Sequence, residues 1–327
     1  MTEKQRILSG IKPTGNIHLG NLCGALSNWV KLQDDYNAFF MIADLHALTT
    51  VYEDTINILK DKEQLKIDLL AIGLDPKKCT LFVQSDVPEH AELHLILSMI
   101  TPLSWLQRVP TYKGTIQELQ TKDLHTYGFL GYPMLQTADI LIYQANYVPV
   151  GKDQIPHLEL TREVARRFNH FFGEVFSLPQ QLLTTIPSLP GTDGRKMSKS
   201  YQNTILVFDS DDLIRKKIMK MITDPSRIRK DDPGHPDVCN VFSYHEIFNK
   251  SEAKNIETNC KSGTVGCVSC KQNCADVMIS YLRKIKNKKQ DLEKDKNYID
   301  KVYEEGAEKA REEAVSTLKI VKKAIRL

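Results

Sequence analysis

The sequence predicts an α/β protein in which a parallel-sheet domain is followed by an all-helical region. Two observations support this fold class. Short apolar runs alternate with helical patterns through the first half of the chain, and only helical patterns remain after about residue 200. Such alternation is typical of strands joined by crossover helices. With 327 residues, the chain is long enough for one large domain or two of ordinary size.

Each expected element is a short apolar run or a helical pattern. Strands are expected at residues 6–9, 38–48, 79–86 and 146–154. Helices are expected between them at residues 21–33, 55–72 and 90–100. In the second half, helices are expected at residues 211–222, 275–289 and 298–325.

The composition is that of an ordinary globular protein, with 41% hydrophobic and 26% charged residues. The net charge of +3 is too small to indicate a nucleic-acid partner by itself. The N-terminal residues lack the apolar core of a signal peptide. No run approaches the roughly 20 apolar residues of a membrane span. We therefore expect a cytoplasmic protein with reduced thiols and no membrane partner.

Polar side chains follow the expected strands. Asp44 and His46 come after the second strand, residues 84–86 close the third, and residues 152–154 follow the fourth. The carboxyl ends of parallel strands form the ligand crevice of an open sheet. We expect these groups to converge on one site, although each could instead be a simple loop or cap residue.

The segment after the first strand reads SGIKPTGNIHLGN, and its Gly15 and Gly20 mark a turn that enters a helix. It matches neither the dinucleotide fingerprint nor a Walker A loop. The free N–H groups of a helix N-terminus nevertheless suit phosphates, and His18 could add a donor. Gly20 would let a base or ribose approach the backbone. A plain strand–turn–helix junction is the alternative.

A second candidate, GTDGRKMSKSYQN at residues 191–203, predicts a basic loop. Lys196 and Lys199 are spaced to meet at one anion, and Ser198 and Ser200 add hydroxyl donors. Such a loop could clamp a polyphosphate during in-line transfer, where positioning and charge stabilisation supply most of the catalysis. The alternative is a solvated basic loop.

Together the two segments resemble the signatures of class I aminoacyl-tRNA synthetases. HLGN, at residues 18–21, looks like the HIGH signature, and KMSKS, at residues 196–200, matches the second signature in full. Over nearly its whole length the chain is similar to bacterial tryptophanyl-tRNA synthetases, notably in DLHALT, FVQSDVPEH, YPMLQTADILIY and VPVGKDQIPHLELTREVARRFN.

The resemblance implies a homodimer and three regions. Residues 1–200 would form a Rossmann-like catalytic domain with the ATP and tryptophan sites and the dimer interface. Residues 201–310 would form a helical anticodon-binding domain with a cysteine cluster, and residues 311–327 a helix that packs back on the first domain. The implied reaction joins L-tryptophan to ATP with Mg²⁺, giving tryptophanyl-adenylate and pyrophosphate, and then transfers the acyl group to tRNA(Trp).

The resemblance also implies site residues. The catalytic groups would be Lys196, Lys199 and His18. The ATP site would consist of Lys12, Thr14, Gly15, His18, Gly20, Asn21, Gly151, Asp153, Lys196, Met197, Ser198, Lys199 and Ser200. The tryptophan site would consist of Leu8, His46, Tyr132, Gln136, Asp139, Val148, Val150 and Gln154.

Asp139 is expected to accept the indole N–H, the only polar group of the tryptophan side chain. Gln136 and Asp139 are three residues apart, so they share one face of a helix. Tyr132 and Gln154 match positions that hold the α-amino group. Three positions depart from the residue that is commoner in the family: Gln136 replaces Met, Lys12 replaces Gln, and Lys152 replaces Glu. Without the resemblance to the family, the sequence pattern would predict that Asp139 is a carboxylate on the surface of a helix.

Four cysteines are candidate metal ligands: Cys239, Cys260, Cys267 and Cys270. The last three have the spacing C-x6-C-x2-C, and Cys274 could replace Cys239. Spacing alone cannot separate zinc from an iron–sulfur cluster, and free thiols remain a third possibility. A subset of bacterial tryptophanyl-tRNA synthetases with this spacing holds a [4Fe-4S] cluster, which makes that cluster the expected cofactor and Zn²⁺ the alternative.

Cations gather in the second half, at residues 214–233 and 281–289. They fit contacts to tRNA phosphates, although a solubilising helix face would have the same pattern. No DNA partner is expected. Two other functions stay open: a cluster-bearing RNA-binding or redox-sensing paralogue that has lost catalysis, and a tyrosyl-tRNA synthetase.

Overall fold

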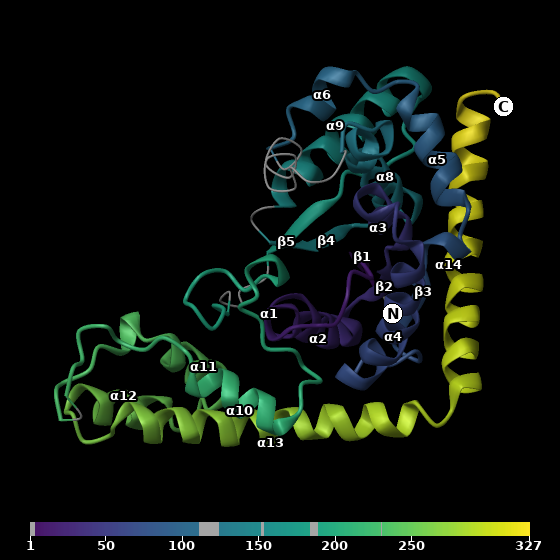
Figure 1. The fold of residues 1–327 in the computed structure, drawn as a ribbon. Helices are drawn as coiled ribbons and strands as arrows, with labels where there is room; N and C mark the ends of the chain where they lie inside the picture. Colours follow the sequence, from purple (N-terminus) through teal and green to yellow (C-terminus); the bar gives the residue numbers. More distant parts are fainter. Residues whose placement is uncertain (1–3, 111–123, 152–153, 184–188, 230) are drawn as a thin grey trace.

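The computed structural model describes residues 4–110, 124–151, 154–183, 189–229 and 231–327, and Figure 1 shows its layers. The described residues form a parallel five-stranded sheet in the order β3-β2-β1-β4-β5. The strands are β1 (Arg6–Ile11), β2 (Asn37–Ile42), β3 (Cys79–Val83), β4 (Tyr147–Val150) and β5 (Gln180–Leu183). The prediction of a parallel sheet and of four strands is confirmed. β5 was missed because it is a short, largely exposed edge strand with polar residues.

The other regular elements of the described chain are helices, joined by loops and turns. In the first half they are α1 (Leu19–Asn21), η1 (Leu22–Leu26), α2 (Ser27–Asp35), α3 (Asp44–Val51), α4 (Thr55–Ile72), η2 (Gln84–Asp86), α5 (Glu89–Ser98), α6 (Leu103–Gln107), α8 (Tyr127–Ile142) and α9 (Ile155–Phe172). In the second half they are η4 (Lys199–Tyr201), α10 (Asp211–Met219), η5 (Pro236–Val238), α11 (Asn240–Phe248), α12 (Ala253–Lys261), α13 (Cys267–Leu292) and α14 (Lys296–Ala324).

Several expected boundaries were wrong. The strands expected at residues 79–86 and 146–154 end at Val83 and Val150. The second expected strand, 38–48, stops at Ile42, and its polar end is the first turn of α3, which begins at Asp44. The helix expected at 275–289 begins earlier, at Cys267. A cysteine-rich segment has no clear apolar period, so the sequence pattern does not mark the start of α13.

Alternate strand residues enter two hydrophobic cores, one on each face of the sheet. Ile7 and Phe40 belong to one core, while Leu8 and Phe39 belong to the other. This follows from the period of two in a β-strand. A parallel sheet covered on both faces needs apolar residues at nearly every position, which explains the continuous apolar run of β2.

The first of these cores continues without a break into the helical region. Ile214 of α10, Tyr244 of α11 and Leu282 of α13 belong to the same cluster as Ile7 and Phe40 of the sheet. Asp68 of α4 also pairs with Lys289 of α13, with 2.8 Å between Oδ1 and Nζ. The helical region is therefore packed against the sheet rather than joined to it by a free linker.

Helix α14 runs along the β3 edge of the sheet, after α13 has crossed the base of the molecule (Figure 1). Three ion pairs join it to the sheet domain: Arg6 with Glu313 at 2.9 Å, Arg311 with Glu89 at 3.0 Å, and Lys322 with Glu92. Gly306 permits the close approach, because a Cβ there would lie 1.8 Å from the backbone oxygen of Leu81. The boundary expected at residue 311 falls inside this continuous helix.

No helix in the described part of the chain is both long enough and apolar enough to cross a membrane.

Gly306→Ala should lower the free energy of unfolding by at least about 2 kcal/mol, because the added methyl group meets backbone that cannot rotate away. Gly128→Ala is the matched control. That glycine is exposed in α8 and a Cβ there meets nothing within 4 Å, so alanine should be neutral or stabilise by up to about 1 kcal/mol. Urea unfolding measures both. Equal midpoints for the two variants would contradict the contact.

Candidate functional site

The two signature segments are held together by backbone hydrogen bonds. Leu19 N donates to Ile205 O at 2.9 Å, and Val207 N donates to Ile17 O at 3.0 Å. Gly20 N also donates to Met197 Sδ at 3.3 Å, and a Cβ on Gly20 would lie 3.0 Å from the His18 ring. The segment HLGN therefore lies directly against the KMSKS loop.

His18 is the N-cap of α1 and forms a reciprocal pair with Asn21. His18 Nδ1 accepts from Asn21 N at 3.2 Å, and Asn21 Oδ1 accepts from His18 N at 3.3 Å. Burial, and then the charge of Lys199, lower the pKa of His18 to about 4. The imidazole is therefore neutral near pH 7. Because Nδ1 accepts, the proton is on Nε2, which can donate to a ligand.

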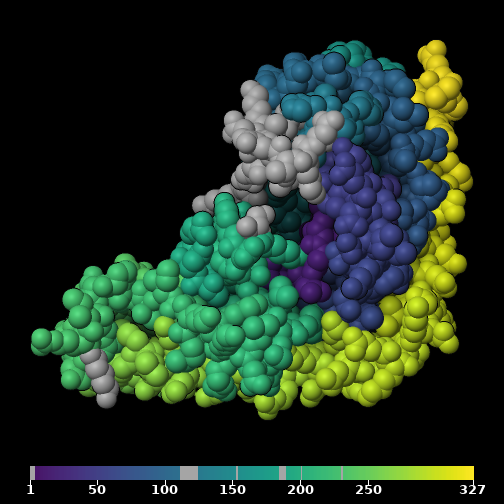
Figure 2. Space-filling view, viewed as in Figure 1, coloured from purple at the N-terminus to yellow at the C-terminus, as the bar shows by residue number. Residues whose placement is uncertain are grey.

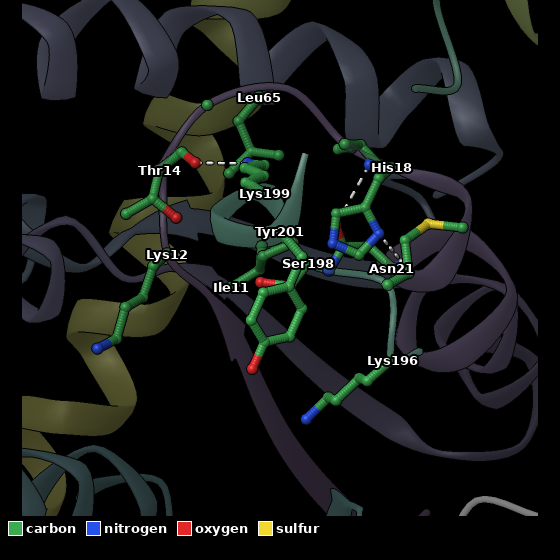
Figure 3. Close-up of a pocket in the computed structure, with 13 residues that line it drawn as sticks. Ile11, Lys12, Thr14, His18, Asn21, Leu65, Lys196, Ser198, Lys199 and Tyr201 are labelled. Carbon is green, nitrogen blue, oxygen red and sulfur yellow. Dashed lines mark hydrogen bonds between the residues drawn. The ribbon is translucent and has the colours of Figure 1, made fainter. Parts of the chain in front are cut away.

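A pocket of about 460 Å³ opens between the two segments (Figure 3). It is lined by Ile11, Lys12, Thr14, Gly15, Ile17, His18, Asn21, Leu65, Lys196, Met197, Ser198, Lys199 and Tyr201. Nine of the thirteen expected ATP-binding residues are in this lining. With three lysines and a histidine, the pocket suits a polyphosphate. The N–H groups of Leu19, Gly20 and Asn21, which were expected to be free for a phosphate, donate to protein acceptors instead.

Lys199 and Lys196 do not meet at one point in this structure. Lys199 Nζ donates to Thr14 O, while the Lys196 side chain points in a different direction (Figure 3). The turn at Gly15 leaves room for the Lys199 side chain. Gly15 has φ +82°, and a Cβ there would lie 3.2 Å from Lys199 Nζ. Burial lowers the pKa of Lys199. The expected convergence of both lysines therefore requires Lys199 to leave Thr14.

Asn203 shapes the KMSKS loop and was not assigned a role from the sequence. Its side chain is buried; Oδ1 accepts from Ser198 N at 2.8 Å, and Nδ2 donates to Asp193 Oδ1 at 2.7 Å and to Lys196 O at 3.1 Å. Residue type and spacing gave no signal for this, because the bonds depend on how the loop folds back on Asn203.

A second pocket, of about 450 Å³, adjoins the first at Lys12. All eight residues expected to bind tryptophan line it: Leu8, His46, Tyr132, Gln136, Asp139, Val148, Val150 and Gln154. Gly151, expected in the ATP site, lines this pocket instead. In the space-filling view the N-terminal segment lies at the bottom of a hollow between the first helices and the second half of the chain (Figure 2).

Asp139 is the buried carboxylate of this second pocket. Its oxygens accept from His46 Nε2 at 2.8 Å, from His90 Nδ1 at 2.6 Å and from Gln84 Nε2 at 2.8 and 3.0 Å. Burial alone would raise the pKa of Asp139, but the charge and hydrogen bonds of the two histidines hold it well below its usual range. Asp139 is an ionised acceptor. It is not the helix-surface carboxylate considered from the sequence.

The groups expected to converge at the strand ends divide into two sets. His46 and Gln154 line the second pocket, and Gln84 bonds to Asp139. Asp44 lines neither pocket: it accepts from Ser85 N at 3.0 Å and from Ser85 Oγ at 2.6 Å. Lys152 and Asp153 lie outside the described residues, as does the side chain of Ser200. Gly20 lies beside the first pocket, against His18.

The cysteines gather at the far end of the helical region. Cys260 is in the last turn of α12, Cys267 and Cys270 are in the first turn of α13, and Cys239 precedes α11. Burial, and then the neighbouring Cys239, Cys260 and Cys267, raise the pKa of Cys270 to about 12. Yet no three His, Cys, Asp or Glu side chains of the described residues are assembled to hold a metal ion. A metal site is thus not confirmed.

Several cations expected to face tRNA are paired with carboxylates instead. Arg215 pairs with Asp276 at 2.7 Å, Lys217 with Asp209 at 2.6 Å, and Lys286 with Asp211 at 2.7 Å. The net positive charge of this surface is therefore smaller than the sequence suggests.

The imidazole of His18 should titrate near pH 4. Because its pKa is about 6.5 in the unfolded chain, the unfolded state alone binds the proton between these values, and stability should fall as the pH drops from 6.5 towards 4. Histidine-labelled NMR measures the titration, with the His18→Asn spectrum identifying the signal. Lys199→Ala should raise the pKa of His18 by removing a nearby positive charge. A His18 titration near 6.5 in the unaltered protein would contradict the burial argument.

Comparison with known proteins places this geometry in a family. A model described as tRNA synthetases class I (W and Y) matches residues 1–283. The chain is 50% identical to the tryptophan–tRNA ligase of Thermotoga maritima over 325 residues, which cover 98% of this chain and 99% of that protein. It is 43% identical to the tryptophan–tRNA ligase of Aquifex aeolicus over 393 residues, covering 98% of this chain and 100% of the relative.

A solved structure agrees with these sequence matches. The tryptophanyl-tRNA synthetase from Campylobacter jejuni, complexed with ADP and tryptophan, superposes with a TM-score of 0.90 at 33% identity, covering 99% of this chain and 100% of that one. Family model, sequence relatives and fold agree over nearly the full length. The chain therefore belongs to the tryptophanyl-tRNA synthetases, within the class I tRNA synthetases.

Proposed function

We propose that this chain is a tryptophan–tRNA ligase in which the two adjoining pockets bind tryptophan and ATP side by side. One observation carries the assignment of the sites: an apolar pocket with a single buried anion, Asp139, opens at Lys12 onto a pocket lined by three lysines and a neutral histidine. The apolar pocket with Asp139 suits an indole, and the pocket with the lysines suits phosphates. Each volume is in the range of small-ligand sites.

In the tryptophan pocket, Asp139 accepts the indole N–H. Tyr132 and Gln154 hold the α-amino group, and Leu8, Val148 and Val150 contact the ring. Held in this way, the substrate presents its carboxylate towards Lys12 and the phosphate pocket. Positioning two reactants in adjoining pockets removes much of the entropic cost of their meeting.

In the first step a carboxylate oxygen of tryptophan attacks the α-phosphorus of ATP. The bond from that phosphorus to the bridging oxygen breaks, and its electron pair leaves with pyrophosphate. His18 Nε2–H, Lys196 and Lys199 donate to the phosphate oxygens as charge develops. Mg²⁺ bound with ATP supplies further neutralisation of phosphate charge. Lys199 takes part by exchanging Thr14 O for a phosphate oxygen.

In the second step a terminal ribose hydroxyl of tRNA(Trp) attacks the acyl carbon, and AMP leaves. The helical region is the expected tRNA-binding surface. Lys216 and Lys220 of this region have no ion-pair partner within the described residues, and they remain candidates for phosphate contacts, whereas Arg215 and Lys217 are paired with carboxylates.

Two assays test the function together. Pyrophosphate exchange into ATP should depend on tryptophan, and total tRNA should be charged with tryptophan alone from a panel of amino acids. Charging with tyrosine would transfer the assignment to the tyrosyl enzymes. Pyrophosphate exchange without charging of tRNA, or the absence of both reactions, would favour a paralogue that has lost all or part of the reaction.

Asp139→Asn should raise the KM for tryptophan in pyrophosphate exchange by about 10- to 100-fold, because it removes a charged acceptor that a buried N–H requires. The matched probe is β-(3-benzothienyl)alanine, in which sulfur replaces the indole N–H. Its KM should change little. Equal effects on both amino acids would contradict the indole role of Asp139.

The cysteine group supports a second proposal: it binds a [4Fe-4S] cluster, with Zn²⁺ as the alternative. Four thiols are a suitable donor set for either. Arg227 Nη1 lies 3.9 Å from the Sγ atoms of both Cys260 and Cys267, where a cation would stabilise thiolates. Cys274 is buried in the hydrophobic core, which favours Cys239 as the fourth ligand.

Protein purified without oxygen should contain iron and acid-labile sulfide and be brown. Cys267→Ser should lose both, while Cys23→Ser, which alters a buried thiol in the core of the first half, should retain them. Metal and sulfide analysis measures this without reference to activity. Zinc at one ion per chain would replace the cluster with a zinc site, and the absence of metal would leave free thiols.

A homodimer is the proposed assembly. Leu95 and Met99, at the end of α5, and Leu103, on α6, are large apolar side chains that are 54%, 73% and 60% exposed, and Tyr127 begins the helix that packs on both. Exposed apolar groups gathered on one face mark an interaction surface, and two-fold pairing of identical faces is the commonest solution. The mass in solution should then be that of two chains.

A further inference from the structure

A buried histidine lies directly behind the anion of the tryptophan pocket. His90, in the first turn of α5, places its two ring nitrogens between two partners: Nδ1 is 2.6 Å from Asp139 Oδ1, and Nε2 is 2.7 Å from the Tyr143 hydroxyl. His90 is fully buried and does not line the pocket. It therefore touches the carboxylate from the protein interior, on the side away from substrate.

The proton arrangement of this row follows from its chemistry. An ionised Asp139 can only accept, so His90 Nδ1 must donate. Burial raises the pKa of Tyr143 well above its ordinary value, so its hydroxyl keeps its proton and can donate to Nε2. Nδ1–H of His90 therefore points at Asp139 in either charge state of the ring: a neutral ring accepts from Tyr143 at Nε2, and a charged ring donates to it.

Gln84 completes the support. Its Oε1 accepts from His46 N at 3.3 Å, which turns its amide nitrogen towards both oxygens of Asp139. Of the three donors to this carboxylate, only His46 lines the pocket; His90 and Gln84 do not. His46 is therefore the donor that an entering indole N–H can replace, whereas the other two remain in place.

We infer that His90 is a positioning residue that sets specificity for the indole N–H, by holding Asp139 ionised and oriented towards the tryptophan pocket. The inference rests on the proposed role of Asp139 as the indole acceptor. His90 touches no substrate atom and acts through Asp139 alone. Its loss should therefore affect recognition of the N–H and leave recognition of the rest of the side chain unchanged.

The test is pyrophosphate exchange by full-length protein with tryptophan and with β-(3-benzothienyl)alanine. His90→Leu should raise the KM for tryptophan on the order of 10-fold or more, with a smaller change in kcat, and should change the KM of the analogue little. His90→Asn should restore much of the discrimination, because its amide N–H can take the place of Nδ1–H. Tyr143→Phe should have a weaker effect in the same direction.

Leu97→Ala is the stability control. Leu97 is fully buried on the same helix, so the substitution should lower the melting temperature without altering the ratio of the two KM values. If His90→Leu weakens both amino acids equally, His90 is only structural and the inference fails. If Asp139→Asn itself leaves the ratio unchanged, the proposed role of Asp139 has failed instead. If Asp139→Asn changes the ratio and His90→Leu does not, only the positioning role is overturned.

Discussion

The pairing of Ile17–Leu19 with Ile205–Val207 is the constraint on which the site depends. Two backbone hydrogen bonds join segments that are far apart in the chain, and Ile17, Leu19, Ile205 and Val207 are all buried in the core at this junction. Burial of these side chains makes the pairing stable. Without it, His18 would not lie beside Lys199, and the phosphate pocket would have only one wall.

Burial also sets the charge at each end of the joined pockets, with opposite results. His18 loses its proton because desolvation and a neighbouring cation disfavour the charged ring. Asp139 keeps its charge because three donors surround it, although it is more deeply buried than His18. The cavity thus has a fixed anion at one end and lysines at the other. This polarity fits the proposed orientation of a zwitterionic amino acid, with its carboxylate towards the lysines.

The helical region and the sheet share one hydrophobic core. This core connects the region proposed to bind tRNA with the sheet that carries the proposed substrate pockets. The cysteine group begins α13, and the following helix, α14, packs on β3 through Gly306. Arg311 of α14 pairs with Glu89, the residue next to His90. The helical region and the pocket that holds Asp139 are thus parts of one continuously packed structure.

The sequence by itself determined the fold class, four of the five described strands, the two signature segments and the chemical kinds of group at the site. These depend on local periodicity and residue type, which do not need long-range information. The five-residue loop signature and the Gln136–Asp139 spacing are likewise local. The edge strand β5, the start of α13 at Cys267, and the roles of Asn203 and His90 were decided only by the tertiary structure. β5 depends on pairing with β4, and His90 on the burial that places it between Tyr143 and Asp139, which are partners distant in the chain. Asn203 bonds within its own loop, but these bonds form only when the loop closes. A histidine in a helix carries no sequence signal of what lies against its two nitrogens, because packing alone supplies those partners.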